Sequence, residues 1–285
     1  MTIQWFPGHM LETENLLTKE IPKTDAVLEI LDARLPISSA NPFVDKLCKD
    51  KFRLKVLNKV DLADPEHTLS WLEYFEKRQI PAISTCGTQP SHLFYALNDC
   101  VNKTNRNKAR KLKIMVLGIP NTGKTTILNT LSGKKIAKTG NSPAITRHQQ
   151  RTSLPNNIDI YDTPGILSPV LEPKEKAYIL AASGAISDAA FDYADVAFFA
   201  AELLIRRYPH LLLVRYPFLE TIPDDPAMLI EKIGSARGCL KKGGVIDYQK
   251  ASETLIRELR AGKIGKISFE TPRDYENEAP QIKSF

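Results

Sequence analysis

Apolar and β-branched residues in the first 162 positions gather in short runs with polar, helix-like segments between them. The six runs lie at residues 25–32, 53–58, 80–84, 113–117, 148–154 and 157–162. Helical segments separate the first four runs, an alternation that is typical of a mostly parallel, doubly wound α/β sheet. The last two are joined only by Pro155 and Asn156, which predicts an antiparallel hairpin at that point.

Capping residues predict where the helices between these strands begin and end. Asn41 before Pro42, and Asp64 before Pro65, each pair an N-cap residue with a first-turn proline. The stretch "TTILNTLSG" ends at Gly133, a residue that commonly stops a helix. We therefore expect helices to begin near residues 42 and 65, and a further helix to end at Gly133.

The pattern changes to helical periods from about residue 174 onward. It is clearest in "KEKAYILAASGAI", "FDYADVAFFAAELLIRRY" and "YQKASETLIRELRAG". Pro169 and Pro173 interrupt the chain just before these segments. The sequence thus predicts a six-stranded α/β domain over residues 1–172, followed by a mainly α-helical domain over residues 173–285.

Charge is unevenly distributed along a chain of 285 residues whose net charge is +6. Residues 103–113 carry six basic and no acidic side chains, and residues 134–151 carry five basic and none acidic. Residues 232–266 carry nine basic against three acidic side chains, whereas residues 174–231 are acidic. Clustered positive charge favours a polyanion such as RNA as a partner. Solvated loops are the competing interpretation of charge alone.

Composition excludes several other classes of protein. The 42% hydrophobic content supports a folded core. The four cysteines are widely separated and lack metal-binding spacing, which indicates reduced thiols in a cytoplasmic protein. No apolar run reaches the roughly 20 residues of a membrane helix, and the start of the chain has no signal-peptide pattern. We therefore expect a soluble cytoplasmic protein that does not bind a membrane.

Residues Gly118–Thr125 match the P-loop pattern GxxxxGK[ST], after a predicted strand and at the start of a predicted helix. The two glycines let backbone N–H groups surround phosphates, and Lys124 is expected to reach the β and γ phosphates. The Thr125 hydroxyl is expected to bind Mg²⁺. A chance match in an unrelated fold is the competing interpretation. The predicted nucleotide-binding residues here are Asn121, Thr122, Gly123, Lys124, Thr125 and Thr126.

The last predicted strand ends in Asp162-Thr163-Pro164-Gly165, a D-x-x-G turn. A carboxylate at this point is expected to hold the hydration shell of Mg²⁺, and the Gly165 N–H to sense the γ phosphate. Between the P-loop and this turn lies "NSPAITRH", in which Thr146 is expected to complete the Mg²⁺ shell and to take part in catalysis. An ordinary loop threonine is the alternative.

Residues 58–61, "NKVD", have the form of a guanine-reading loop. A carboxylate at Asp61 can accept hydrogen bonds from the N1–H and the 2-amino group of guanine, which adenine cannot offer. Asn58 is expected to contact the base or to brace the P-loop, and the Lys59 stem to cover the ring. Ser84 and Thr85 follow another strand, where backbone N–H groups are expected to contact the guanine oxygen.

Together these motifs resemble a GTPase, and the order of guanine loop, P-loop and switches resembles the circularly permuted GTPases. The segments "WFPGHM", "ILDARLPISSANP", "PNTGKT" and "GKIGKISFETP" resemble the ribosome biogenesis GTPase A family over essentially the whole chain. The resemblance implies a cytoplasmic, Mg²⁺-dependent GTPase that acts late in assembly of the large ribosomal subunit. It further implies binding to ribosomal RNA and ribosomal proteins, and faster hydrolysis on the particle. We expect a monomer.

The residue that orients the attacking water is not where many GTPases have it, because Ile166 follows the D-x-x-G turn. The resemblance implies His9 as the catalytic group; packing of that histidine on neighbouring aromatic residues is the alternative. It also implies that Asn121 is a candidate ligand for K⁺, although Asn121 can instead only shape the loop. Two other functions remain open: a GTP-dependent RNA-binding module with negligible hydrolysis, and a P-loop phosphotransferase, which the guanine loop disfavours.

Overall fold

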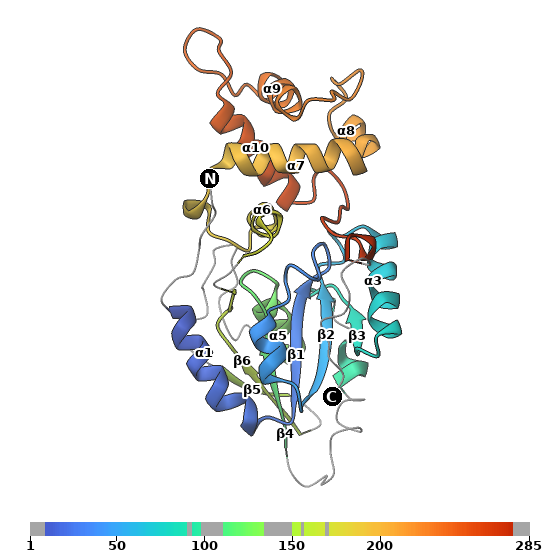
Figure 1. Cartoon of the computed structure of the whole chain (residues 1–285), viewed down its shortest axis with the longest axis vertical. Coiled ribbons are helices and arrows are strands. Elements are labelled where there is room, and N and C mark those ends of the chain that lie inside the picture. The colour runs from blue at the N-terminus through green and yellow to red at the C-terminus, as the bar shows by residue number, and fades with distance from the viewer. Residues whose placement is uncertain are drawn as a thin grey trace.

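The computed structural model describes residues 9–89, 93–97, 111–133, 150–154, 157–168 and 171–275. Six strands form one sheet in the order β3-β2-β1-β4-β6-β5, and most C-terminal helices lie beyond one end of it (Figure 1). The strands are β1 (Ala26–Asp32), β2 (Phe52–Asn58), β3 (Ala82–Ser84), β4 (Leu112–Leu117), β5 (Gln150–Leu154) and β6 (Ile158–Asp162). The predicted α/β fold class is confirmed.

Each strand lies within two residues of its predicted range. Strand β1 pairs in parallel with both β2 and β4, β3 extends the sheet in parallel from β2, and β6 extends it from β4. Only β5 runs antiparallel, against β6, as the short connection between them predicted. The parallel strands therefore end at one common edge of the sheet, which is where ligands bind in open α/β sheets.

The helices packed on the sheet are α1 (His9–Glu20), α2 (Pro42–Leu47), α3 (Pro65–Lys77) and α5 (Lys124–Ser132), and residues 93–97 are also helical. The predicted caps are confirmed: Asn41 Oδ1 accepts from the Phe43 N–H at 3.0 Å, and Asp64 Oδ1 from the Glu66 N–H at 2.9 Å. Gly133 ends α5 in the left-handed conformation. The sequence pattern did not single out α1.

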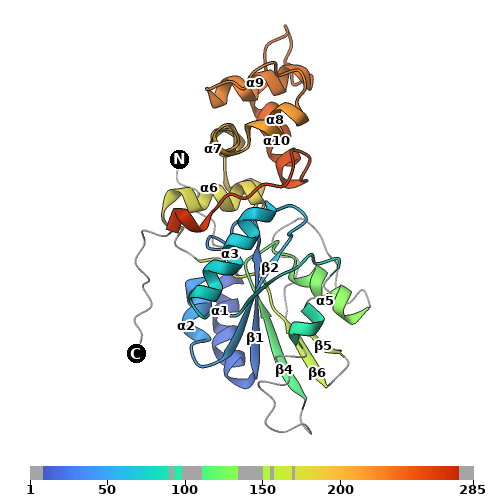
Figure 2. The same cartoon turned by 90° about the vertical axis from the view of Figure 1, so that its right-hand side faces the viewer.

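Helices cover both faces of the sheet, with α5 on the face opposite to α1, α2 and α3 (Figure 2). Alternate residues of β1 supply the two cores: Leu28 packs with Ile127 of α5, and Val27 packs with Leu17 of α1 and Val44 of α2. Every residue of β1 is buried. Burial on both faces is what a central parallel strand requires.

The C-terminal helices are α6 (Lys174–Ser183), α7 (Tyr193–Arg207), α8 (Pro209–Arg215), α9 (Pro226–Ala236) and α10 (Tyr248–Arg260), with short 3-10 helices η1 (Ile21–Lys23), η2 (Asp188–Ala190) and η3 (Pro272–Tyr275) elsewhere. Three of these helices, α6, α7 and α10, match the predicted segments, whereas α8 and α9 were not predicted. The helices share one core that includes Leu180, Leu204 and Leu255. Among the helices of the described residues, none has the length and hydropathy to span a bilayer.

The chain returns to the sheet after α10. The Phe269 N–H donates to the Arg34 carbonyl at 2.7 Å, and Trp71 Nε1 donates to the Glu270 carbonyl at 3.2 Å. The ring of Tyr275 lies 5.9 Å from the ring of Trp71. The last described residues thus pack against α3 and the loop after β1, and the division at residues 172 and 173 stays a prediction.

Candidate nucleotide-binding site

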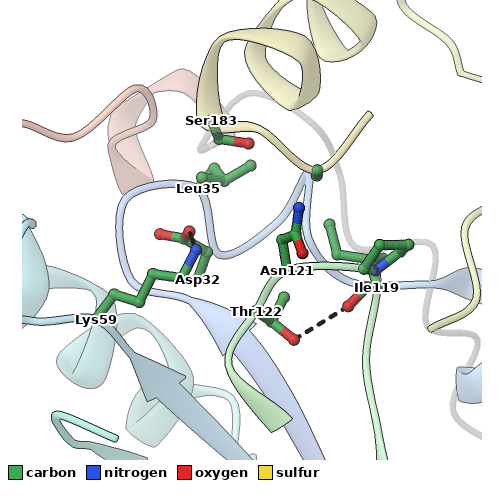
Figure 3. A pocket seen from close by; sticks show the side chains of 9 residues that line it. Asp32, Leu35, Lys59, Ile119, Asn121, Thr122 and Ser183 are labelled. Atoms are coloured by element: carbon green, nitrogen blue, oxygen red, sulfur yellow. Dashed lines mark hydrogen bonds and ion pairs between the residues drawn. The ribbon is translucent and has the colours of Figure 1, made fainter. Parts of the chain in front are cut away.

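The predicted P-loop connects β4 to α5 and has the backbone shape that its glycines allow. A Cβ on Gly118 would lie 2.4 Å from the Ile30 carbonyl oxygen, so the loop passes too close to β1 for any side chain. Gly123 has a φ of 90° and caps α5, which begins at Lys124. Thr122 Oγ1 donates to the Ile119 carbonyl at 3.1 Å (Figure 3). The start of α5 therefore supplies N–H groups suited to an anion.

Lys124 lies buried across the loop that precedes it. Its Nζ donates to the carbonyl oxygens of Gly118 at 3.1 Å and Ile119 at 2.8 Å. Burial lowers the pKa of Lys124 to about 8, and the nearby Asp162 carboxylate only partly offsets that effect. The ammonium group is therefore held at the loop but poorly stabilised there, which favours an additional anionic partner.

Thr125 and Asp162, the two described residues that were predicted to bind the metal, lie together. Thr125 Oγ1 donates to Asp162 Oδ2 at 3.3 Å. Asp162 Oδ1 is buried and has no hydrogen-bond partner among the described residues, and burial raises the pKa of this carboxyl group. A hydroxyl and an orphaned carboxylate oxygen are hard ligands that fit Mg²⁺. Thr146 lies outside the described residues.

The D-x-x-G turn lies against the P-loop. A Cβ on Gly165 would be 2.7 Å from the Pro120 nitrogen, and the Ile166 N–H donates to the Gly118 carbonyl at 3.2 Å. The Ile166 side chain is fully buried in the core that contains Leu17. Ile166 is therefore a core residue, and the site needs another group to orient water.

Asn58 joins the guanine loop to the P-loop. Its Nδ2 donates to the Thr122 carbonyl at 2.7 Å, so of its two predicted roles the structure shows the brace. A Cβ on Gly123 would lie 2.3 Å from that nitrogen, so the second P-loop glycine is required by the brace as well as by its φ angle. Asn58 Oδ1 is buried without a partner among the described residues.

Lys59 is bound by Asp32, a residue that belongs to none of the predicted nucleotide-binding motifs. The Lys59 backbone has a φ of 65°, and its Nζ lies 2.9 Å from Oδ2 of the buried Asp32. Arg34 also binds Asp32, through Nε at 3.0 Å and Nη2 at 2.8 Å. The two cations outweigh burial and hold the pKa of Asp32 far below its usual range, while burial lowers the pKa of Lys59. The only sequence signal was the "DAR" of "ILDARLP".

The other predicted base-binding residues flank this loop. The Asp61 side chain is exposed, so its carboxylate is accessible to a ligand. Ser84 is the last residue of β3. The Thr85 N–H donates to the Leu57 carbonyl of β2 at 2.8 Å, and the Thr85 carbonyl accepts from the Val60 N–H of the guanine loop at 3.4 Å. These contacts bring the end of β3 beside the guanine loop. Thr126 lies half-buried in the first turn of α5.

Asn121 connects the P-loop to the first C-terminal helix. It has a φ of 60°, and its Nδ2 donates to the Gly184 carbonyl at the end of α6, at 2.7 Å. The preceding carbonyl, of Ser183, accepts from Arg34 Nη2 at 3.3 Å. The predicted K⁺ ligand thus has a protein partner at its amide nitrogen. His9 begins α1, but its side chain lies outside the described residues.

A crevice that is open in part to solvent and too narrow to hold a water molecule lies where these loops meet (Figure 3). Its walls come from the loops after β1, β2 and β4 and from the end of α6. They are Asp32, Leu35, Lys59, Ile119, Pro120, Asn121, Thr122, Ser183 and Ala185. The guanine loop and the P-loop therefore face a common space, although about sixty positions separate them in the sequence.

Comparison of the sequence with known proteins shows which family the chain belongs to. A model of the family described as 50S ribosome-binding GTPase matches residues 113–208. Over 97% of its length the chain is 41% identical to ribosome biogenesis GTPase A of Priestia megaterium, of which the match covers 99%. The chain belongs to the ribosome biogenesis GTPase A family.

Other members of the ribosome biogenesis GTPase A family match over similar lengths. That of Bacillus cereus is 40% identical over 99% of this chain and 98% of its own, and that of Thermotoga maritima is 32% identical over 95% of each. Among solved structures, a GDP-bound YlqF matches with a TM-score of 0.68, 29% identity, and coverage of 91% of this chain and all of that chain. A GNP-bound YlqF from T. maritima matches with a TM-score of 0.67 and 28% identity over 92% of this chain and 98% of that one.

Proposed function

We propose that this GTPase family member hydrolyses GTP to GDP and phosphate as a switch in late assembly of the large ribosomal subunit. The observation that carries the proposal is the junction at the edge of the sheet. There Asn58 of the guanine loop bonds to the P-loop, and Gly165 of the D-x-x-G turn packs against the same loop. The solved relatives are described as GDP-bound and GNP-bound, which supports a guanine nucleotide as the ligand.

Each loop has a defined part in binding. Lys124 neutralises charge on the β and γ phosphates, and these anions would offset the burial that lowers its pKa in the free protein. Thr125, Asp162 and Thr146 would hold Mg²⁺, which offsets phosphate charge when bound. Asp61 reads the base, the Lys59 stem covers the ring, and the Ser84 backbone N–H contacts the guanine oxygen. The Thr85 N–H, which was expected to share that contact, instead donates to the Leu57 carbonyl and holds the end of β3 beside the loop.

Hydrolysis requires that a water oxygen attack the γ phosphorus while the bond to the β–γ bridging oxygen breaks. Ile166 is buried and cannot orient that water. Resemblance to the family favours His9 for this task, and we propose that it orients the water. Replacing His9 with Ala should lower stimulated turnover far more than GTP affinity; equal turnover would remove His9 from the mechanism. The proposed role of Asn121 as a K⁺ ligand is tested by replacing Na⁺ with K⁺. A GTP hydrolysis rate that stays the same would remove K⁺ from the mechanism.

The partner we propose is the large-subunit precursor, through ribosomal RNA and ribosomal proteins that contact residues 173–285. Basic residues there include the exposed Lys241 and Lys242, between α9 and α10. We expect the particle to accelerate hydrolysis. Co-sedimentation with ribosomal subunits, with GDP or a GTP analogue bound, tests the proposal: binding that depends on the nucleotide supports a switch, and no binding in either state contradicts it.

A GTP-dependent RNA-binding module with negligible hydrolysis is the second candidate, and the burial of Ile166 favours it. Single-turnover GTP assays with and without large-subunit particles separate the two candidates. Hydrolysis that the particle accelerates supports the enzyme. GTP that stays intact in both conditions, together with retained RNA binding, supports the module.

A further inference from the structure

The chain after α10 forms a strap, residues 262–275, that lies along the guanine loop, which extends here over residues 58–64. The Ile267 N–H donates to the Leu62 carbonyl at 3.0 Å. Ser268 Oγ accepts from the Asp64 N–H at 3.3 Å, and the Ser268 side chain is fully buried. These bonds flank Asp61, the residue expected to read guanine, on its C-terminal side.

The strap also supports the other side of the guanine loop, through the segment after β1. The Arg34 carbonyl accepts from the Phe269 N–H at 2.7 Å and from the Glu270 N–H at 3.3 Å. The buried Glu270 carboxylate accepts from the Ile37 N–H at 2.9 Å and the Ser38 N–H at 3.0 Å. The strap is thus connected to Lys59 through Arg34 and Asp32, and to the residues that follow Asp61 through Leu62 and Asp64.

The same few strap residues are fixed to the C-terminal helices. The Tyr208 hydroxyl, between α7 and α8, accepts from the Ser268 N–H at 2.9 Å and donates to the Ser268 carbonyl at 3.3 Å. Arg207, at the end of α7, donates to the Phe269 carbonyl at 3.1 Å and pairs with Asp274 at 3.0 Å. Ser268 is therefore bonded at once to the guanine loop and to the helical region.

We propose that the strap is a positioning element of guanine recognition that sets how fast the nucleotide leaves. The inference rests on the proposed function, because it requires the guanine loop to hold a guanine base. When the strap is in place, the loop presents Asp61 in one position. When it is displaced, the Asp64 N–H and the Leu62 carbonyl lose their partners and the loop samples other positions. Movement of the helical region can then release GDP without a separate exchange factor.

The first test compares the release of radiolabelled GDP and inosine diphosphate from the full-length protein. The base of inosine diphosphate lacks the 2-amino group, so a mispositioned Asp61 costs GDP more than it costs inosine diphosphate. Ser268→Ala should speed GDP release roughly three- to tenfold, the effect of one hydrogen bond, and inosine diphosphate release by less. Ser252→Ala, a buried serine on α10 away from the strap, is the matched control and should change neither rate.

A pair of glycines gives a second test with equal backbone strain. Gly262 and Gly238 both have a φ of 67° after a helix end, but a Cβ on Gly262 would lie 2.7 Å from Leu62 Cδ2, whereas one on Gly238 meets nothing within 4 Å. Gly262→Ala should speed GDP release, because Leu62 must shift. Gly238→Ala should leave release unchanged while lowering stability by a similar amount.

The connection to the helical region is tested with two tyrosines. Tyr208→Phe removes the hydroxyl that binds Ser268, and Tyr216→Phe removes a buried hydroxyl that bonds to Glu258 within the helical region at 3.0 Å. Only Tyr208→Phe should speed GDP release, because the Tyr208 hydroxyl interacts with Ser268 and with the Asp64 side chain, whereas the Tyr216 hydroxyl bonds to Glu258.

Unchanged GDP release in the Ser268, Gly262 and Tyr208 variants would overturn the inference. Equal acceleration of GDP and inosine diphosphate would also overturn it, because the strap would then support only the general fold. Failure of the proposed function looks different: the unmodified protein would bind neither nucleotide, or would not distinguish GDP from ADP.

Discussion

The P-loop and the guanine loop are held in different ways. The P-loop, residues 118–125, makes bonds within itself, since Lys124 and Thr122 donate to carbonyls of the loop, and it also accepts the Asn58 brace from outside. The guanine loop, residues 58–64, depends on distant partners: Asp32 binds Lys59, and Ser268, 204 positions away, binds Asp64. A loop with bonds of its own depends less on the rest of the chain. A loop held from outside can be controlled by whatever holds it.

Loss of the charge at the centre of the P-loop should have the largest effect. Lys124→Ala removes the cation that we propose binds the β and γ phosphates, and should weaken binding of a non-hydrolysable GTP analogue roughly 300-fold. Calorimetric titration measures it. Lys111→Ala, which removes a half-exposed lysine near Asp159, should leave binding unchanged. A loss below about tenfold for Lys124→Ala would mean that the P-loop does not carry the phosphates.

Breaking the external support of the guanine loop should come next. Asp32→Asn leaves Arg34 buried without its counter-charge, and should lower the free energy of unfolding by about 3 kcal/mol in urea titrations. Asp45→Asn disrupts the more exposed pair with Arg53, and should cost less than about 1 kcal/mol. Equal losses in the two variants would show that Asp32 gives the guanine loop no special support.

The bond that joins the two loops should have a smaller effect. Asn58→Ala leaves the buried Thr122 carbonyl without its partner and frees the guanine loop from the P-loop. Such a loss is worth about 2 kcal/mol, so GDP binding should weaken roughly 30-fold. If the Asn58→Ala variant binds GDP more weakly but pyrophosphate equally well, the bond supports recognition of the base. If the variant also binds pyrophosphate more weakly, the bond supports the phosphate-binding loop.

The smallest effect should come from pH. Burial lowers the pKa of Lys124 to about 8 in the free protein, and bound phosphates raise it again, so binding takes up a proton above about pH 8. GDP affinity should therefore be constant below pH 7 and roughly tenfold weaker at pH 9, because about a tenth of Lys124 is then charged. Lys124→Arg keeps its charge and should show no such slope. A slope that persists in Lys124→Arg would assign the titration to another group.

The sequence was most informative where the structure is local. Alternating runs predicted all six strands because burial on a sheet face imposes its period on neighbouring residues. The Asn41 and Asp64 caps were predicted because a cap bonds within its own first turn. The P-loop was predictable for the same reason.

The contacts that hold the guanine loop could not be predicted from a single sequence. Nothing near Ser268 in the chain indicates a bond to Asp64, because the bond depends on the path of the chain after α10. The ion pair between Asp32 and Lys59 could not be predicted either, because the two residues come together only when β1 and β2 lie side by side. The motifs therefore predicted which loops meet at the edge of the sheet. They did not predict the tertiary contacts that hold the guanine loop in place.

The proposed function requires that Asp61 and Lys124 hold opposite ends of one guanine nucleotide. The most direct measurement is the affinity of Asp61→Asn for GDP and for xanthosine diphosphate. An amide N–H at this position can donate to the 2-oxo group of xanthine but repels the 2-amino group of guanine. The variant should prefer xanthosine diphosphate, with Lys124 still required for binding. An unchanged preference for GDP would contradict it.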